Sequence, residues 1–205
     1  MKPRGSLHSH GRPSAERPAR LTFASPARRV MLAADPNLSA LYRVRCQPPV
    51  PQVRVDDVRV TVQALKSSTP VESRMELALN PAVFWEIEFL AGIAGLKADL
   101  RELPLHSLDI IGGASQVSLN LAWPAGTVYL YIFGSIIQSA IRRPAGVGVR
   151  LRVNGSVHDL ALDDQHFETV GGEAILDSAG FDRSAGRYEI TITGSADRLS
   201  ILEET

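Results

Sequence analysis

The sequence predicts an all-β protein built from stacked repeats of short strands, and three observations support this prediction. Apolar and polar residues alternate over many short segments, which is the pattern of strands with one buried face. Each such segment is followed by glycine or another small residue and then by a second alternating segment. This phrase recurs, and four copies beginning at Ala91, Gly112, Gly134 and Gly155 are spaced 21, 22 and 21 residues apart. One unit cannot bury its own apolar face, whereas stacked units can, so we expect a solenoid-like stack or a sandwich derived from one.

The repeat is clearest in Leu108–Leu119, where Gly112 occupies the first slot after the strand. Glycine there allows a sharp bend, and we expect Gly112 to have a positive φ. Counting from that slot, the third, sixth and eighth positions hold apolar or small residues, apart from Ser139, and should point inward. The outer copies begin at Ser25 and Gly194, so the first and last intervals are 66 and 39 residues. These long intervals predict insertions at 33–80 and 163–188.

Residues 1–20 contain scattered arginines, glycines and prolines, and we expect a disordered basic tail before a single domain at 21–205. Residues 1–30 hold seven basic residues and one acid, a net charge of +6, so the remainder of this neutral chain carries −6. The tail either has no role or gives weak electrostatic attachment to an acidic surface. It contains no aromatic residue to stack on bases, so we expect no sequence-specific nucleic-acid binding.

Within the domain, residues 21–32 form the first copy of the repeat. Asp35 and Pro36 are typical of a helix cap and first helical position, so a minor short helix is expected near 36–42. Pro48, Pro49 and Pro51 exclude regular structure around them. The remaining elements follow from alternation and turn residues: a hairpin at 53–62, a strand at 75–79, the regular repeats at 86–162, a short strand at 174–176 and the last copy at 188–202.

No arrangement of residues in the sequence is typical of catalysis or cofactor binding. Histidines are isolated, the glycine pairs do not extend into a phosphate-binding loop, and no nucleophile motif is present. His166 beside Asp163 and Asp164 comes nearest to a metal site, and we interpret these residues as a surface turn. We therefore expect no enzymatic activity, no catalytic residues, no cofactor and no metal. An enzyme with a site built from loop 163–188 is the last-ranked alternative.

The number of cysteines and the lengths of the apolar stretches indicate which cellular compartment the protein occupies. Cys46 is the single cysteine, so no internal disulfide can form, which fits a reducing environment. No apolar stretch reaches the length of a membrane helix, and the N-terminus has no apolar core of a secretory signal. We expect a cytoplasmic protein without a transmembrane segment.

The outward residues of the stacked strands offer a candidate contact patch formed by Tyr129, Tyr131, Arg150 and Arg152. If the copies stack in register, the tyrosines lie beside the arginines, and we expect ring–guanidinium contacts. Tyrosine and arginine are also the residues that protein interfaces favour. The alternative is that the 33–80 insertion covers these side chains.

The bend Gly112-Gly113-Ala114-Ser115 and the segment Arg142–Val153 between two copies resemble the toastrack (putative-adhesin) β-repeat family. Relatives in that family include the C-terminal domains of LiaF-type regulators of bacterial envelope stress. The resemblance covers roughly residues 85–202. It implies a stacked β fold without an active site that serves as a sensing or interaction module.

Together these observations predict a non-catalytic interaction or scaffold protein that binds a protein partner or associates with itself. The resemblance adds a possible link to envelope-stress sensing. The alternative is a carbohydrate or small-ligand binding module that uses Tyr129, Tyr131 and Trp123.

Overall fold

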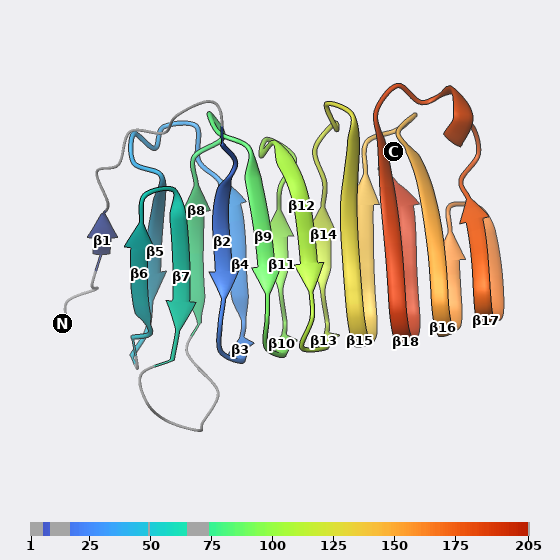
Figure 1. The fold of residues 1–205 in the computed structure, drawn as a ribbon, viewed down its shortest axis with the longest axis horizontal. Coiled ribbons are helices and arrows are strands. Elements are labelled where there is room, and N and C mark those ends of the chain that lie inside the picture. The colour runs from blue at the N-terminus through green and yellow to red at the C-terminus, as the bar shows by residue number, and fades with distance from the viewer. Residues whose placement is uncertain (1–5, 9–16, 49, 65–73, 205) are drawn as a thin grey trace.

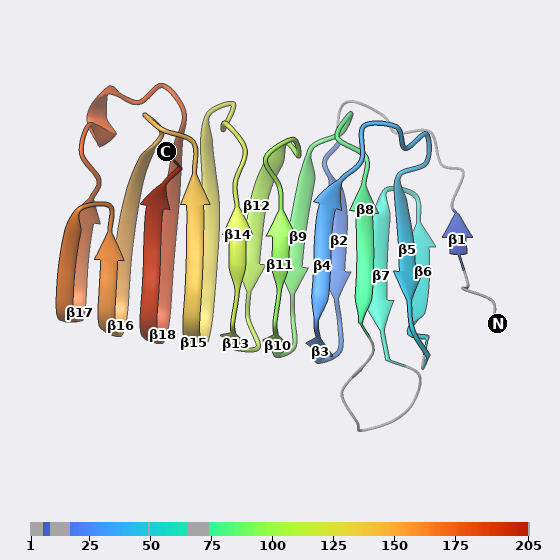
Figure 2. The ribbon, with the colours of Figure 1, turned by 180° about the vertical axis from the view of Figure 1, so that it is seen from behind.

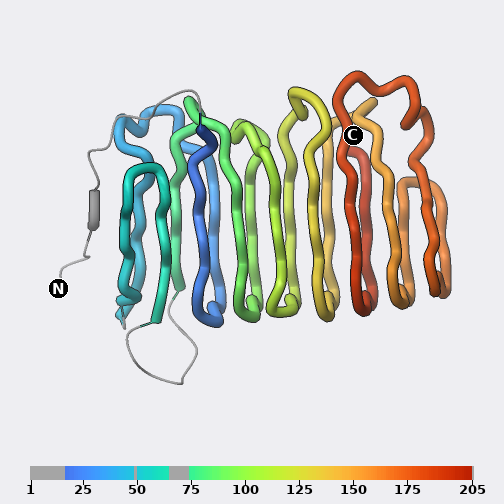
Figure 3. Tube along the Cα trace, in the orientation of Figure 1, coloured from blue at the N-terminus to red at the C-terminus, as the bar shows by residue number. Residues whose placement is uncertain are grey.

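A computed structural model describes residues 6–8, 17–48, 50–64 and 74–204 of the 205-residue chain. The prediction of an all-β stack is confirmed: the strands form one long sheet that curls into two facing layers (Figures 1 and 2). In each regular repeat the chain runs along the front layer, bends at the lower edge and returns along the back layer (Figure 3). We call such a pair of strands a rung.

The shorter rungs use separate strands in each layer. The front strands are β2 (Ala19–Phe23), β6 (Gln52–Asp56), β7 (Arg59–Gln63), β9 (Trp85–Phe89) and β12 (Leu105–Ile110). The back strands are β4 (Val30–Ala34), β5 (Tyr42–Cys46), β8 (Met75–Leu79), β11 (Lys97–Asp99) and β14 (Ser118–Asn120). Short strands at the bends are β3 (Ala27–Arg28), β10 (Ile93–Ala94) and β13 (Ala114–Ser115).

Four long strands cross both layers because their bends keep the ladder continuous. They are β15 (Thr127–Arg143), β16 (Gly148–Leu162), β17 (Gln165–Asp177) and β18 (Arg187–Glu203). The first of them, β15, pairs in parallel with β12, β13 and β14 in turn. One 3₁₀ turn, η1 (Phe181–Arg183), precedes β18.

The rungs do not stack in sequence order. β18 pairs in parallel with β15 on one side and with β16 on the other, so the last copy of the repeat is inserted between the two copies before it. β17 pairs antiparallel with β16 and forms the outermost rung at that end. At the other end, β7 and β8 stack beside β2 and β4, and antiparallel β6 and β5 lie outside them. The two predicted insertions thus include the strands of the end rungs.

Part of the expected N-terminal tail forms β1 (Ser6–His8), which pairs antiparallel with β5. Residues 1–5 and 9–16 lie outside the described residues, and β2 begins at Ala19. The division of the chain into a tail at 1–20 and a domain at 21–205 therefore stays a prediction.

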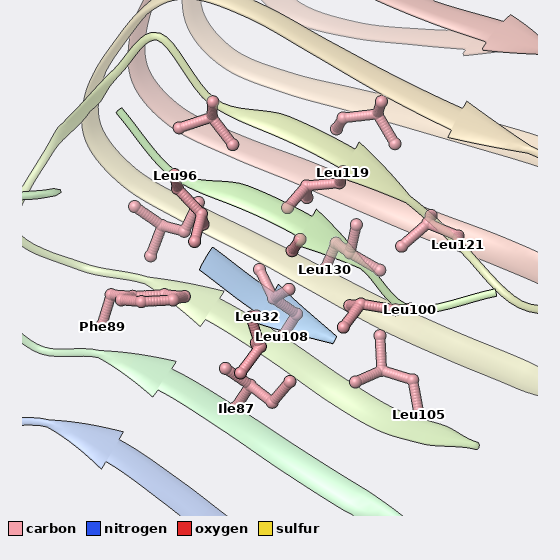
Figure 4. Close-up of a cluster of buried hydrophobic side chains, with 14 of the residues drawn as sticks. Leu32, Ile87, Phe89, Leu96, Leu100, Leu105, Leu108, Leu119, Leu121 and Leu130 are labelled. Atoms are coloured by element: carbon pink, nitrogen blue, oxygen red, sulfur yellow. The ribbon is translucent and has the colours of Figure 1, made fainter. Parts of the chain in front are cut away.

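The interior of the stack is apolar and continuous from rung to rung, as the alternation predicts. Side chains from both layers interdigitate there (Figure 4), and equivalent phenylalanines of neighbouring rungs, Phe23 and Phe89, stack with ring centroids 4.8 Å apart. The third, sixth and eighth positions of all six copies are buried. Ser139, the exception in the pattern, accepts a hydrogen bond from the Val117 amide at 3.4 Å, which satisfies its hydroxyl in the core.

The bends differ in one detail from the prediction. Positive φ occurs at Gly113 (80°) but not at Gly112. Gly112 is required because a Cβ at this position would lie 2.3 Å from the carbonyl carbon of Ala91 in the rung beside it. A second bend, absent from the prediction, follows at the fifth position of every copy, where φ lies between 53° and 71°. Its occupants are Arg29, Gly95, Gln116, Gln138, Asp159 and Arg198.

The predicted helix near 36–42 is wrong. The Asp35 side chain accepts a hydrogen bond from the Asn37 amide, but the chain makes a turn there and reaches β5 at Tyr42. The Asn80 side chain donates hydrogen bonds to the carbonyls of Leu38 and Ala40, at 2.8 and 3.1 Å. These tertiary bonds take the place of helical ones, so local capping signals do not decide the conformation.

Candidate contact surface

The outer face of the front layer carries two unbroken rows of side chains, because the parallel pairing keeps equivalent positions in line. Each residue in a row is the register partner of the next. The first row reads Arg59, Arg20, Glu86, Ser107, Tyr129, Glu189, Arg150 and Asp177. The second reads Thr61, Thr22, Glu88, Asp109, Tyr131, Thr191, Arg152 and Ile175.

A cluster of exposed apolar side chains lies near the middle of this face. Tyr129, Tyr131 and Phe133 alternate outward along β15, and their rings are nearly parallel, with centroids 6.0 and 6.2 Å apart. Ile110 is the register partner of Ile132, and Phe89 is the register partner of Ile110. Ile111 and Leu90 directly follow Ile110 and Phe89, and so continue the cluster sideways from Phe133. We call these five residues the aromatic stripe. Four of them, all but Tyr131, are between 41% and 46% exposed.

Carboxylates flank the stripe on the β9 and β12 side. Arg20 holds Glu86 with two hydrogen bonds of 2.8 and 2.5 Å and lies 3.5 Å from Glu88. Asp109, the register partner of Tyr131, forms no ion pair with the described residues, and its Oδ1 is shielded from solvent without a hydrogen-bond partner. Burial, and then the charges of Glu88 and Glu86, raise the pKa of the Asp109 carboxyl above its ordinary value.

The expected adjacency of the tyrosines and arginines is wrong. Because β18 is inserted between β15 and β16, Glu189 and Thr191 separate Tyr129 and Tyr131 from Arg150 and Arg152. The alternation placed the tyrosines on the outward side of their strand but did not give this order of strands.

Both arginines are also engaged within the protein. Arg150 donates two hydrogen bonds of 2.8 Å to Asp177, and its guanidinium lies 4.2 Å from the ring centroid of Phe181. Arg152 lies 3.7 Å from the Glu189 carboxylate. We infer that Arg150 mainly holds the η1 loop against the end of the stack, whereas the tyrosines face outward.

The described part of the 33–80 insertion does not cover the tyrosines. Its strands lie beyond β2, which is separated from β15 by β9 and β12. Residues 65–73, in the middle of the insertion, lie outside the described residues.

Sequence reasoning missed Phe133, Ile111 and Leu90 as members of this surface, whereas the alternation already placed Asp109 in the outward row of Tyr131. Phe133 continues the alternation that begins at Tyr129, so the spacing of the three rings was available as a signal. Ile111 and Leu90 carry no such signal, because they are exposed only where each strand enters its bend.

Asp163 and His166, which the sequence places nearest to a metal site, form ion pairs with different partners. Asp163 is bound by Arg143, whereas His166 lies 3.8 Å from Asp159. Across residues 6–8, 17–48, 50–64 and 74–204, no group of three or more histidine, cysteine, aspartate or glutamate side chains is placed to hold a metal ion. Within the same ranges, no helix is long and apolar enough to cross a membrane.

No protein-family model matches the chain, and no curated protein matches it. Among solved structures, the chain is similar to that of a putative cell adhesion protein from Clostridium sporogenes ATCC 15579, with a TM-score of 0.69. The two are 18% identical over 98% of this chain and 100% of that chain. A putative adhesin from Bacteroides fragilis NCTC 9343 matches with a TM-score of 0.33 and 8% identity over 100% of this chain and 98% of that chain.

The first comparison shows a shared fold. It supports, at the level of fold, the putative-adhesin part of the expected resemblance. It does not bear on the toastrack or LiaF part. This chain therefore has the stacked β fold of a solved protein described as a putative cell adhesion protein.

Proposed function

We propose that this protein is a non-catalytic interaction scaffold that binds a partner protein through the aromatic stripe. The observation that supports this most is the gathering of Tyr129, Tyr131, Phe133, Ile111 and Leu90 on one outer face. Exposed apolar side chains gathered on one face are typical of protein contact sites, whereas scattered ones are not. The stripe also stands on strands that are paired on both sides, so its geometry is set before a partner arrives.

The charges around the stripe favour a basic partner. Glu86 and Glu88 share one arginine, Glu189 has Arg152, and Asp109 has no cationic partner among the described residues. A lysine or arginine of the partner would gain the Asp109 carboxylate and the neighbouring Tyr131 ring together.

Self-association through the outermost strand is less favoured. Two β17 strands could pair antiparallel with Ala174 facing Phe167, which keeps the inward side chains aligned. This register places Glu168 opposite Glu173, and like charges in that position destabilise a sheet. This register disfavours a β17–β17 pair, and we propose a different protein as the partner.

The carbohydrate alternative requires the three predicted aromatic residues on one surface. Trp123 is 62% exposed, but it lies in the loop before β15 and outside the outward row of that strand. The setting we propose is a cytoplasmic protein linked to bacterial envelope-stress sensing. That setting rests on the sequence resemblance and the single cysteine alone.

The test uses the full chain with an affinity tag as bait in cells of its native host. Tyr131→Ser with Phe133→Ser should abolish recovery of the partner while changing the melting temperature by no more than a few degrees, because both rings are outside the core. Ile175→Ser is the matched control, since Ile175 is 58% exposed on the same face but lies on β17. Equal recovery by the double variant, or an equal loss in the control, would overturn the proposal.

A further inference from the structure

The back layer carries a groove on the opposite side of the stack from the aromatic stripe. It has a volume of about 620 Å³, within the range of small-ligand sites. Ala33 on β4 and Ala78 on β8 are register partners and form its floor, since their short side chains leave space between longer neighbours. Arg43 and Arg45 of β5 border one side, and Lys97 and Asp99 of β11 border the other.

Among the described residues that line the groove, the carboxylates have partners of opposite charge, whereas two of the cations do not. Each of its carboxylates has an arginine partner: Asp35 pairs with Arg43, Glu76 with Arg74, and Asp99 with Arg101. Arg45 and Lys97 also line the groove, but neither forms an ion pair or a side-chain hydrogen bond with the residues that the structure describes. Among the described residues, these two cations therefore have no anionic partner and are placed to bind a ligand.

These two cations are positioned to act on the same molecule. Arg45, Glu76, Met31 and Lys97 are successive register partners across β5, β8, β4 and β11. Three strand spacings separate the two cations, which is about 14 Å between backbones. Glu76 and Met31 lie between them, and Ala78 and Ala33 form the next row along the same strands. Because both side chains are long and rise from opposite walls, they can lean toward this alanine floor.

A hydrogen-bonding group completes the lining. Asn120 of β14 borders the groove, and its Oδ1 is shielded from solvent without a hydrogen-bond partner among the described residues. Because an unsatisfied buried acceptor is costly, the Asn120 side chain gains if it turns this oxygen toward the groove and accepts a hydrogen bond from a ligand. Met31 and the two alanines add apolar contact area beside these polar groups.

We propose that this groove binds an acidic sugar, meaning a short oligosaccharide with carboxylate or sulfate groups. Its anionic groups pair with Arg45 and Lys97, a hydroxyl donates to Asn120, and the apolar face of a ring lies on Ala33 and Ala78. The site is independent of the aromatic stripe and does not rest on the proposed function.

Isothermal titration calorimetry of the full chain tests this with trigalacturonic acid and a heparin tetrasaccharide as carboxylated and sulfated probes. Maltotriose is the neutral probe. We expect at least one acidic probe to bind, maltotriose not to bind, and Arg45→Gln or Lys97→Gln to weaken binding about tenfold each. Preference for one acidic probe then distinguishes the carboxylated from the sulfated source.

The control is Arg183→Gln, which removes an exposed cation of η1, far from the groove. It should leave the affinity unchanged, and all variants should melt near the temperature of the unmodified protein because the three side chains lie outside the core. Equal binding of maltotriose, absence of binding by both acidic probes at millimolar concentration, or unchanged affinity in both groove variants would overturn the proposal.

Discussion

Arg143, at the end of β15, donates two parallel hydrogen bonds of 2.7 Å to the carboxylate of Asp163, which follows β16. Since β18 lies between those strands, this ion pair spans the inserted rung. The same guanidinium donates to the Val147 carbonyl at 2.6 Å and lies 3.3 Å from Glu203 at the end of β18. Arg143 is fully buried, so one side chain joins the ends of three rungs.

Removal of this guanidinium should destabilise the protein strongly. Arg143→Gln leaves Asp163 without its partner, and breaking a buried pair costs about 3–5 kcal/mol of unfolding free energy. Arg198→Gln is the control, because the Arg198–Asp197 pair is exposed and should contribute less than about 1 kcal/mol. Urea denaturation measures both values, and similar losses in the two variants would refute the role of Arg143.

The Arg150–Asp177 pair should give a defined acid dependence. Its hydrogen bonds lower the pKa of the Asp177 carboxyl below the ordinary value. The pair therefore stabilises the fold above the unfolded pKa of about 3.9, and the contribution is lost as the pH falls through the lower folded pKa. The difference in unfolding free energy between the unmodified protein and Asp177→Asn should be small and constant at neutral pH, because solvent screens the exposed pair, and it should shrink below pH 4. A difference that grows on acidification would contradict this assignment.

Where neighbouring rungs are in contact at a glycine of the bend, replacing that glycine with a residue that has a side chain should destabilise the protein. A Cβ at Gly112 would lie 2.3 Å from the backbone of Ala91, so Gly112→Ala should lower the unfolding free energy by more than about 2 kcal/mol. A Cβ at Gly126 would have no neighbouring atom within 4 Å, and φ there is not positive, so Gly126→Ala should change it by about 0.5 kcal/mol or less. Thermal melts of the two variants check this contrast, and a neutral Gly112→Ala would show that the rungs are not in close contact.

Replacing Asp109 should lower the affinity for a basic partner without lowering the stability of the protein. Its raised pKa means that ionisation costs folding free energy, and stability falls as the pH rises from the unfolded value through the folded one. Asp109→Asn should therefore be at least as stable as the unmodified protein at pH 7, while its affinity for a basic partner falls about tenfold. Chemical denaturation and a binding titration are needed together. A loss of stability without a loss of binding would mean that Asp109 is structural.

The strands and their buried faces could be predicted because period-two alternation is a local property of the chain. The buried third, sixth and eighth positions, including Val117 and Leu119, follow from it directly. The order of the rungs could not be predicted in this way, since β18 presents the same alternation whether it follows β16 or lies beside β15. That order decided the candidate surface, because it placed β18 between the two tyrosines and Arg150 and Arg152.

The prediction of a helix near 36–42 was wrong for a related reason, because a residue distant in the sequence decides the conformation there. Asp35 and Pro36 are good starting residues for a helix, but hydrogen bonds from the distant Asn80 hold the carbonyls of Leu38 and Ala40 in another conformation. The left-handed bend at the fifth repeat position also escaped prediction, because residues such as Arg29 and Gln116 do not favour positive φ.

The most direct test of the contact surface is site-specific photo-cross-linking in living cells. A photoreactive phenylalanine analogue replaces Tyr131 in one variant and Ser200, which points outward from the back layer, in another. We predict that position 131 forms a covalent adduct with one partner protein, identified by mass spectrometry, and that position 200 does not. The same adducts from both positions, or none from position 131, would contradict the assignment of the stripe as the binding face.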